Sequence, residues 1–413
     1  MKNLLSEVLE EIKPDKEYER EIFQKAESII KKINSGLKNA KAVLGGSGAK
    51  GTWLKSFDAD IFVKFNYAKF RDKSSLISDV LEKFLKKHFK IKRFHGSRDY
   101  FQIREGKFTF EIVPILYIKK AEEAKNITDV SPLHSDFVLK HKKIIDEIRL
   151  TKQFFKAARV YGAESYIRGF SGYVCEVLTI YYGSFLNLLK GMEKWQGGTV
   201  IDVKNYYKGK NVFSELNKSK LTSPLIIIDP VQKDRNAAAA LDKEKFDIAK
   251  HRAREFLKSP SKEFFTAKTL TQEDIINKFG RDKVVIIEAK PLGKKIDVAG
   301  AKMLKAFHFI DSNLIDREFK VIESDMLWDA KGKSLFYYAL QNAKLPEMTE
   351  LSGPPLKITK HAEIFKKKHK KTFVKNNRLF AVEKRKFTDA RVLINWVLKT
   401  QNVKENLISI KII

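Results

Sequence analysis

The sequence predicts an α+β protein built from more than one domain. Its 413 residues exceed what one hydrophobic core usually organises, which indicates roughly two to four domains that fold without disulfides. Strand and helix patterns alternate over residues 1–139, helical spacing dominates residues 140–257, and alternation returns over residues 258–413. We take these three stretches as the predicted domains.

The first stretch predicts a small α/β domain. Apolar residues at helical spacing indicate one or two surface helices over residues 5–36, followed by a strand that runs into a glycine-rich turn. The predicted elements after those helices are a strand at 42–44, a turn at 45–48, a helix start at 49–54, a strand at 58–65, a helix at 75–88, and strands at 100–104 and 108–117.

The other two stretches differ in their periodicity. The middle one predicts helices at 144–161 and 172–190, with a strand at 225–228. The last one predicts strands at 284–288, 319–328, 334–340, 378–386 and 407–413, helices at 298–309 and 389–398, a turn at 329–333, and a proline break at 353–355 before a basic helix. This alternation resembles a ferredoxin-like α/β tail, a common scaffold for RNA contact that alone proves no function.

The chain is strongly basic. Its formal net charge of +30 is spread over the whole length, which favours a polyanionic partner and predicts binding that weakens with salt. The alternatives are lysines that only solvate helix faces, or a membrane surface. Residues 1–6 form no secretory core and no run of about 18 apolar residues occurs, so we expect a cytoplasmic protein without membrane spans. The lone Cys175 predicts a buried structural thiol.

The turn that ends the first strand predicts a phosphate cradle. In residues 46–52 the glycines allow close backbone approach, and the helix that follows points free N–H groups and its positive dipole end at a ligand. Gly-Ser turns before helices are also frequent without any ligand, so the turn is informative only together with the strand that follows.

That next strand carries two carboxylates on one face. Asp58 and Asp60 are two residues apart, so their side chains emerge about 7 Å apart along the chain and can hold Mg²⁺ through oxygen ligands. Glu111 lies in the apolar run 108–115, where a buried lone acid costs several kcal/mol unless it is paired or binds a metal. If the two strands are neighbours, the three acids converge as a two-metal site requires.

Lys152 interrupts an apolar helix stripe. Ile145, Ile148, Phe155 and Ala158 form the stripe, and Lys152 occupies a position where a hydrophobic residue is expected. The two interpretations are a lysine that reaches out to solvent and one directed at a nucleotide phosphate.

These motifs together resemble a known family. The cradle and the paired acids, with Ser47 eleven residues before Asp58, are similar to the signature of the DNA polymerase β-type nucleotidyltransferase superfamily. Further segments resemble the archaeal, class I CCA-adding enzymes over nearly the whole chain: residues 131–134, 147–152, 168–173, 182–185, 198–202, 229–231, 235–236, 353–355 and 384–387. The resemblance implies a polymerase β-like nucleotidyltransferase head (1–139), a mostly helical middle (140–257) and a ferredoxin-like tail (258–413).

The resemblance also implies roles for particular residues. It implies that Asp58, Asp60 and Glu111 bind Mg²⁺ and that the incoming CTP or ATP is contacted by Ser47, Lys50, His134, Lys152, Tyr161 and Arg235. The implied reaction restores the 3′-terminal CCA of tRNA without a template, with the middle and tail holding the acceptor stem and T-arm, commonly in a homodimer. The family often has arginine at the position of Lys50 and aspartate at that of Glu111; both changes keep the charge.

Some alternatives stay open at this point. Another template-independent RNA transferase, forming poly(A) or oligoadenylate, would use the same metal chemistry, and a noncatalytic RNA-binding protein on a decayed transferase fold is the alternative from another class. His134 could instead cap a helix or bond within the core. The basic run 366–371 contacts RNA phosphates or only solvates a helix.

Overall fold

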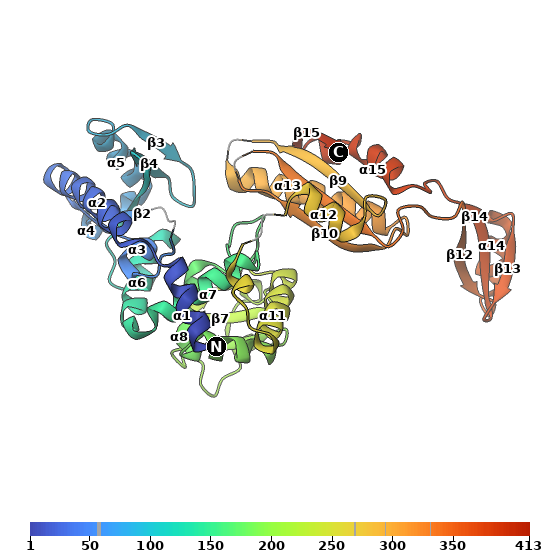
Figure 1. Cartoon of the computed structure of the whole chain (residues 1–413), viewed down its shortest axis with the longest axis horizontal. Coiled ribbons are helices and arrows are strands. Elements are labelled where there is room, and N and C mark those ends of the chain that lie inside the picture. Colours follow the sequence, from blue (N-terminus) through green and yellow to red (C-terminus); the bar gives the residue numbers. More distant parts are fainter. Residues whose placement is uncertain (56–58, 268–269, 294, 331) are drawn as a thin grey trace. The chain divides into compact units, whose positions relative to one another are not determined.

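The computed structural model describes residues 1–55, 59–267, 270–293, 295–330 and 332–413. It separates into two compact units, Met1–Lys268 and Thr269–Ile413 (Figure 1). The finer boundaries expected near residues 139 and 257 stay predictions. Within the described ranges, every helix is too short or too polar to cross a lipid bilayer.

A five-stranded mixed sheet forms the first part of the N-terminal unit. Its strands lie in the order β1-β2-β5-β4-β3, and β2 and β5 are parallel while the other neighbours are antiparallel. The strands are β1 (Ala40–Leu44), β2 (Ala59–Phe65), β3 (Ile91–Phe94), β4 (Tyr100–Glu105) and β5 (Phe108–Leu116). The helices of this part are α2 (Lys16–Gly36), α3 (Gly46–Lys50), α4 (Tyr67–Phe70) and α5 (Ile77–Leu85), whereas α1 (Lys2–Ile12) packs in the core of the helical part that follows.

Helices α2 and α5 cover only one face of this sheet. Ile33 of α2 and Leu81 of α5 share a hydrophobic core with Ile61 of β2 and Ile112 of β5. Because side chains alternate along a strand, the neighbouring positions of β2 and β5 project from the opposite face. That opposite face carries the acids of the candidate site.

The second part of the N-terminal unit is mostly helical, as predicted. Its helices are α6 (Ser131–Leu139), α7 (Ile145–Ala157), α8 (Gly172–Tyr182), α9 (Phe185–Glu193), α10 (Val212–Glu215) and α11 (Lys243–Lys258), and its small sheet contains β6 (Thr199–Asp202), β7 (Leu225–Asp229) and β8 (Gln232–Asn236). Phe154 lies at the centre of an aromatic core, with ring contacts to Phe185, Phe256 and Phe265. This packing fixes α7 against α9 and α11.

The C-terminal unit contains the predicted ferredoxin-like fold. The order β-α-β-β-α-β is made by β9 (Val284–Pro291), α13 (Ile296–Ile315), β10 (Val321–Leu327), β11 (Ser334–Leu340), α15 (Ala390–Leu398) and β15 (Leu407–Ile412). The strands pair antiparallel in the order β10-β11-β9-β15. Alternating residues of β9 bury both faces: Val285 and Ile287 against α13 and α15, Val284 and Ile286 with Ile275 of α12 (Gln272–Phe279). A short helix, α16 (Gln401–Lys404), precedes β15.

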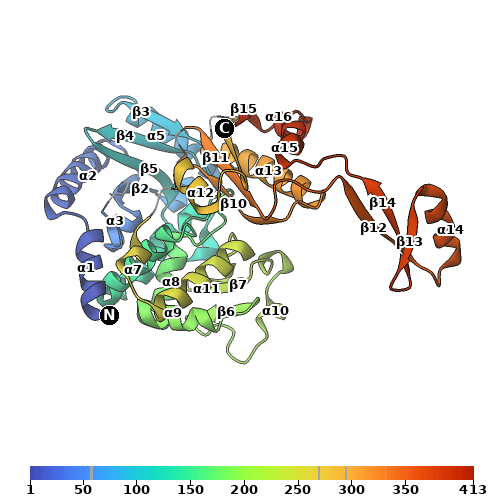
Figure 2. The ribbon, with the colours of Figure 1, turned by 45° about the vertical axis from the view of Figure 1, so that its right-hand side comes forward.

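A three-stranded insertion separates β11 from α15. It consists of β12 (Met348–Pro355), α14 (Thr359–Lys368), β13 (Thr372–Lys375) and β14 (Arg378–Lys384), with the strand order β12-β14-β13. Helix α14 packs against β12, and Figure 2 shows it beside the three strands. The basic run expected to be helical forms the last turn of α14 and the residues after it.

Four local predictions are wrong, each for a backbone reason. The first helix of the middle part ends at Ala157 rather than residue 161, because Arg159 adopts a φ of +59°. The helix expected over 172–190 is broken at Gly183, which adopts a φ of +78°. The helix expected over 49–54 ends at Lys50, because Gly51 adopts a φ of +70°. Residues 353–355, expected to break the structure, belong to β12, an edge strand where the missing N–H of proline interrupts no hydrogen bond between strands.

Candidate active site

The glycine turn packs directly on one of the predicted acids. Strand β1 ends at Leu44, and Gly45 is the N-cap of the short helix α3. Gly46 adopts a φ of +54°, and a Cβ atom there would lie 1.6 Å from Oδ2 of Asp60. Position 46 therefore requires glycine for two reasons: its backbone conformation and the carboxylate beside it. Ser47 follows in the first turn of α3.

Asp60 and Glu111 are direct neighbours in the sheet. They pair in the parallel register of β2 and β5, on the face that α2 and α5 leave uncovered. Glu111 also accepts a hydrogen bond from Nε2 of Gln102 at 3.0 Å, which fixes its carboxylate toward β4. Asp58, the third predicted acid, lies outside the described residues.

The donors of this pair suit a hard divalent cation. Asp60 and Glu111 lie on adjacent parallel strands, whose backbones are roughly 4.8 Å apart, and their carboxylates present oxygen ligands of the kind that Mg²⁺ and Ca²⁺ prefer. Among the residues that the structure describes, no three acidic, histidine or cysteine side chains gather closely enough to hold a metal by themselves. A metal site here thus rests on Asp60 and Glu111 with further ligands from outside the described set, such as Asp58 or substrate oxygens.

A second group of predicted residues converges on Glu176, a buried residue of α8. Its carboxylate accepts hydrogen bonds from Nζ of Lys50 at 2.7 Å, Oγ1 of Thr52 at 2.7 Å and Nζ of Lys152 at 2.8 Å. Lys152 Nζ also donates to Oγ1 of Thr52 at 2.9 Å. The two lysines predicted to contact a nucleotide are therefore held together by one acid.

Burial and charge together decide how this cluster titrates. Glu176 is 0% exposed and Lys152 is 3% exposed. Burial opposes ionisation of Glu176, but the Lys152 and Lys50 charges outweigh it and lower the pKa of the carboxyl to about 2. Burial lowers the pKa of Lys152, an effect that Glu176 opposes and Lys50 reinforces. Because two lysines share one carboxylate, the cluster has an excess of positive charge that attracts an anion.

A third group is built around Asp229 at the end of β7. His134 Nε2 lies 3.0 Å from Oδ2 of Asp229, Tyr173 donates its hydroxyl to Oδ1 at 3.1 Å, and Arg235 donates to Oδ2 at 2.5 Å. The ring of His134 also stacks on that of Tyr173, with the ring centroids 3.9 Å apart. Burial raises the pKa of Asp229, but its bond and charge interaction with His134 dominate and lower it.

Tyr161 completes the set of predicted nucleotide contacts. It lies beyond the end of α7 in an isolated bridge to Phe170. A Cβ atom at Gly172 would lie 2.6 Å from the Tyr161 hydroxyl and 3.8 Å from Cε of Lys152, so both side chains flank the start of α8. Burial raises the pKa of the Tyr161 hydroxyl, which keeps it a neutral hydrogen-bonding group.

Helix α8 positions several of the predicted nucleotide-binding residues, a role that was not predicted from the sequence. Gly172 accommodates Tyr161, Tyr173 joins the Asp229 group, and Glu176 binds both lysines. The available signals were a glutamate inside the apolar stretch 173–178 and an aspartate directly after the apolar strand 225–228. Either buried acid requires partners, which the structure identifies as residues predicted from elsewhere in the chain.

Comparisons with known protein families cover most of the chain. A family model described as nucleotidyltransferase domain matches residues 24–161. One described as tRNA nucleotidyltransferase, second domain, matches residues 146–266, and one described as CCA-adding enzyme, C-terminal domain, matches residues 297–407. The first two meet in α7, which carries Lys152.

Individual relatives extend this similarity along most of the chain. The CCA-adding enzyme of Methanocaldococcus jannaschii is 33% identical over 94% of this chain and 88% of its own length. That of Nanoarchaeum equitans is 35% identical over 84% of each chain, and that of Pyrobaculum aerophilum is 30% identical over 97% of this chain and 94% of its own.

Solved structures share the fold at much lower identity. A crystal structure of the Cid1 poly(U) polymerase aligns with a TM-score of 0.52 and 14% identity, covering 64% of this chain and 98% of that one. A cytoplasmic RNA terminal U-transferase aligns with a TM-score of 0.51 and 14% identity, covering 65% of this chain and 98% of that one. These likenesses support the predicted polymerase β-like head.

Proposed function

The chain belongs to the family of archaeal CCA-adding enzymes, and from this membership we propose that it adds C, C and A in turn to the 3′ end of tRNA. The reaction uses CTP and ATP, releases pyrophosphate and needs no nucleic-acid template. The single observation that carries the proposal is the pairing of Asp60 and Glu111 beside the Gly46 turn in a chain of this family.

The proposed metal ligands are Asp58, Asp60 and Glu111, with Mg²⁺ as the ion. When bound there, the metal supplies activation of the RNA 3′-hydroxyl and stabilisation of the charge on the departing pyrophosphate. Gly46 keeps the turn against the Asp60 carboxylate, so the ligand oxygens and the phosphate-binding backbone stay adjacent.

The proposed nucleotide contacts come from the three groups around this pair. Ser47 and the turn amides bind phosphate oxygens, and Lys50 and Lys152 supply positive charge from the Glu176 cluster. His134, Tyr161 and Arg235 orient the nucleotide, with Arg235 contributing to base selection together with the RNA end. Glu176 and Asp229 act as positioning residues because each binds these side chains rather than the substrate.

The proposed partner is tRNA, held by its acceptor stem and T-arm. The net charge of +30 and the three lysines in the last turn of α14 support a polyanionic ligand. A homodimer in the cytoplasm is part of the same proposal; it rests on the family resemblance and on the tRNA substrate.

The test is product sequencing on a defined substrate. Purified protein is incubated with Mg²⁺ and a tRNA transcript that lacks its last three nucleotides, with CTP alone, ATP alone or both. We expect CC with CTP alone and CCA with both nucleotides. An Asp58→Asn, Asp60→Asn variant should add nothing, while Asp72→Asn, a matched exposed aspartate outside the site, should act like the wild type.

Other outcomes would assign a different activity. Tails of A alone would identify a poly(A)-forming or oligoadenylate-forming transferase. Efficient addition to any RNA would remove the tRNA assignment, and no incorporation under any condition would favour an RNA-binding protein without activity.

A further inference from the structure

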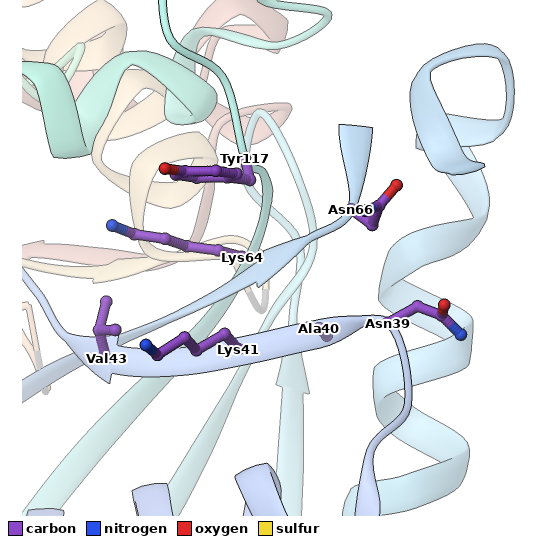
Figure 3. Close-up of a pocket in the computed structure, with 7 residues that line it drawn as sticks. All are labelled: Asn39, Ala40, Lys41, Val43, Lys64, Asn66 and Tyr117. Atoms are coloured by element: carbon purple, nitrogen blue, oxygen red, sulfur yellow. The ribbon is translucent and has the colours of Figure 1, made fainter. Parts of the chain in front are cut away.

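A groove lies at the edge of the five-stranded sheet, away from the three groups described above. It is about 400 Å³ in volume and is lined by Asn39, Ala40, Lys41, Val43, Lys64, Asn66 and Tyr117 (Figure 3). Strand β1 is the outer strand of the sheet here, next to β2. We call this feature the edge groove. Its volume falls within the range of small-ligand sites.

The edge groove opens on the same sheet face as the candidate metal ligands. Lys41 pairs with Lys64 in the register of β1 and β2, and both lie opposite the helix-covered face that buries Ala42 and Val63. Lys64 is four residues after Asp60 on β2, so about 13 Å of strand separates them. One continuous face thus joins the acids to the edge groove.

Two lysines without acidic partners supply the charge of the groove. Within the described ranges, neither the Lys41 nor the Lys64 ammonium lies at ion-pair distance from a carboxylate; Asp136 acts on Lys64 through its charge alone. Burial lowers the pKa of Lys64, Asp136 raises it and Lys41 lowers it. Two neighbouring cations of this kind repel one another, and an anion between them relieves that repulsion.

An exposed aromatic ring forms the opposite wall. The Tyr117 N–H donates to the Phe65 carbonyl at 2.8 Å, which anchors the residue at the end of β5. Its ring lies over Lys64, with Nζ 5.8 Å from the ring centroid, and the residue is 53% exposed. Figure 3 shows the polar ends of Lys41, Lys64 and Tyr117 directed toward the Val43 end of β1, which continues into Gly45 and Gly46.

Paired cations beside an accessible aromatic ring are typical of a single-stranded nucleic-acid site, where phosphates meet lysine and bases stack. We propose that the edge groove binds one nucleotide of the RNA strand near its 3′ end, with the phosphate at Lys41 and Lys64 and the base against Tyr117. This inference rests on the proposed function and adds a contact for the RNA strand. None of the seven described residues that line the groove is acidic, so this lining offers no carboxylate for the metal that accompanies a free triphosphate.

The test measures how RNA affinity depends on salt. The dissociation constant for the tRNA transcript lacking its last three nucleotides is determined between 50 and 200 mM salt (roughly the range over which phosphate contacts dominate) for full-length variants. For Lys41→Gln, Lys64→Gln we expect weaker binding and a log–log slope shallower by about 0.7, since the two lysines together neutralise one phosphate and each neutralised phosphate of a single strand contributes about 0.7. Tyr117→Leu should weaken binding by about 5- to 100-fold with no change of slope, and Tyr117→Phe should bind like the wild type.

A matched pair of lysines provides the control. Lys31 and Lys32 are exposed on α2, which covers the opposite face of the same sheet, so Lys31→Gln, Lys32→Gln removes the same charge without touching the groove. This variant should keep the wild-type slope. Equal slopes for both lysine pairs would overturn the inference, and so would variants that raise KM for CTP while leaving RNA affinity intact.

The experiment separates this inference from the proposed function. If the wild-type protein adds CCA but the groove variants bind RNA like the control pair, the inference about the groove is wrong and the proposed function stands. If the groove variants change the salt dependence but the wild-type protein adds no nucleotide, the RNA contact stands and the proposed function is wrong.

Discussion

The ammonium group of Lys152 in α7 donates a hydrogen bond, 2.8 Å long, to the fully buried carboxylate of Glu176 in α8. Lys50, the last residue of α3, donates a hydrogen bond to the same carboxylate at 2.7 Å. The pair therefore connects the turn that carries Ser47 with the helical part of the unit. A nucleotide that depends on both lysines depends on Glu176 to hold them in register, although Glu176 itself need not touch it.

Replacing Glu176 by glutamine should destabilise the protein. Two ammonium groups would remain buried without a counter-charge, and breaking a buried ion pair in this way typically costs about 3–5 kcal/mol. Urea denaturation gives the free energy of unfolding, and CMP incorporation gives the loss of activity. Glu193→Gln, an exposed residue at the end of α9, should change neither. In the double variant Glu176→Gln, Lys152→Met the losses should be less than additive, and strict additivity would argue against the pairing.

The stability of the protein should fall in acid partly through this same residue. The pKa of Glu176 is lowered to about 2 in the folded state from its usual value of 4.5. The unfolded chain therefore takes up the proton first, and the contribution is complete above about pH 5 and is lost as the pH falls from 4.5 toward 2. Denaturation midpoints measured across this window should decline less steeply for Glu176→Gln. Parallel curves for variant and wild type would show that Glu176 is not the group that titrates.

Much of the fold and part of the site could be predicted from the sequence. Strand β11 has the predicted bounds, and the described part of the strand that carries Asp60 lies within the predicted range 58–65, because both are apolar, largely buried runs. Residue pairings such as Lys50 with Glu176 could not be predicted, since they join positions 126 residues apart through tertiary packing. Short strands such as β3 and β13 also escaped, because four residues carry too little pattern to distinguish a strand from a loop.

Substituting alanine for Gly46 should abolish activity by displacing the carboxylate of Asp60. The added Cβ would lie 1.6 Å from Oδ2, and the φ of +54° would add strain. Gly106→Ala separates these two effects, because Gly106 has a φ of +63° and nothing within 4 Å of the added atom. Both variants should lose about 1–2 kcal/mol of stability from strain, but only Gly46→Ala should lose Mn²⁺ affinity and nucleotide addition. Equal activity of the two would contradict the close contact.

Replacing Asp229 by asparagine should loosen nucleotide selection. The neutral amide cannot balance the charge of Arg235, and its N–H₂ group competes as a donor where His134, Tyr173 and Arg235 already donate. We expect a higher KM for CTP and ATP and more misincorporation at the 3′ end, measured by steady-state kinetics and end sequencing. Asp234→Asn, an exposed aspartate on the neighbouring strand β8, should leave both unchanged. Unaltered KM and fidelity in Asp229→Asn would show that the Asp229 group does not position the nucleotide.

Changes at Glu111 itself should reduce activity more than changes at Gln102, which only orients Glu111. Glu111→Gln removes the charge of a proposed metal ligand, so we expect activity to fall by more than about 100-fold. That is the upper limit for changing a residue that only hydrogen-bonds a ligand. Gln102→Leu removes only the 3.0 Å bond that orients Glu111 and should cost about 10- to 100-fold.

Glu111→Asp tests the same residue without removing its charge. It keeps the oxygen ligands but withdraws them by one methylene from the position beside Asp60, so activity should be reduced and partly recovered at high metal concentration. Titration of Mn²⁺ by electron paramagnetic resonance, alongside CMP incorporation, should rank metal affinity and activity in the same order. Glu105→Gln, at the exposed end of β4, controls for the loss of one negative charge near the sheet. If Glu111→Gln bound Mn²⁺ and added nucleotides as well as that control, the metal would have to be held by Asp60 without Glu111, and the register pairing of the two acids would have only a structural role.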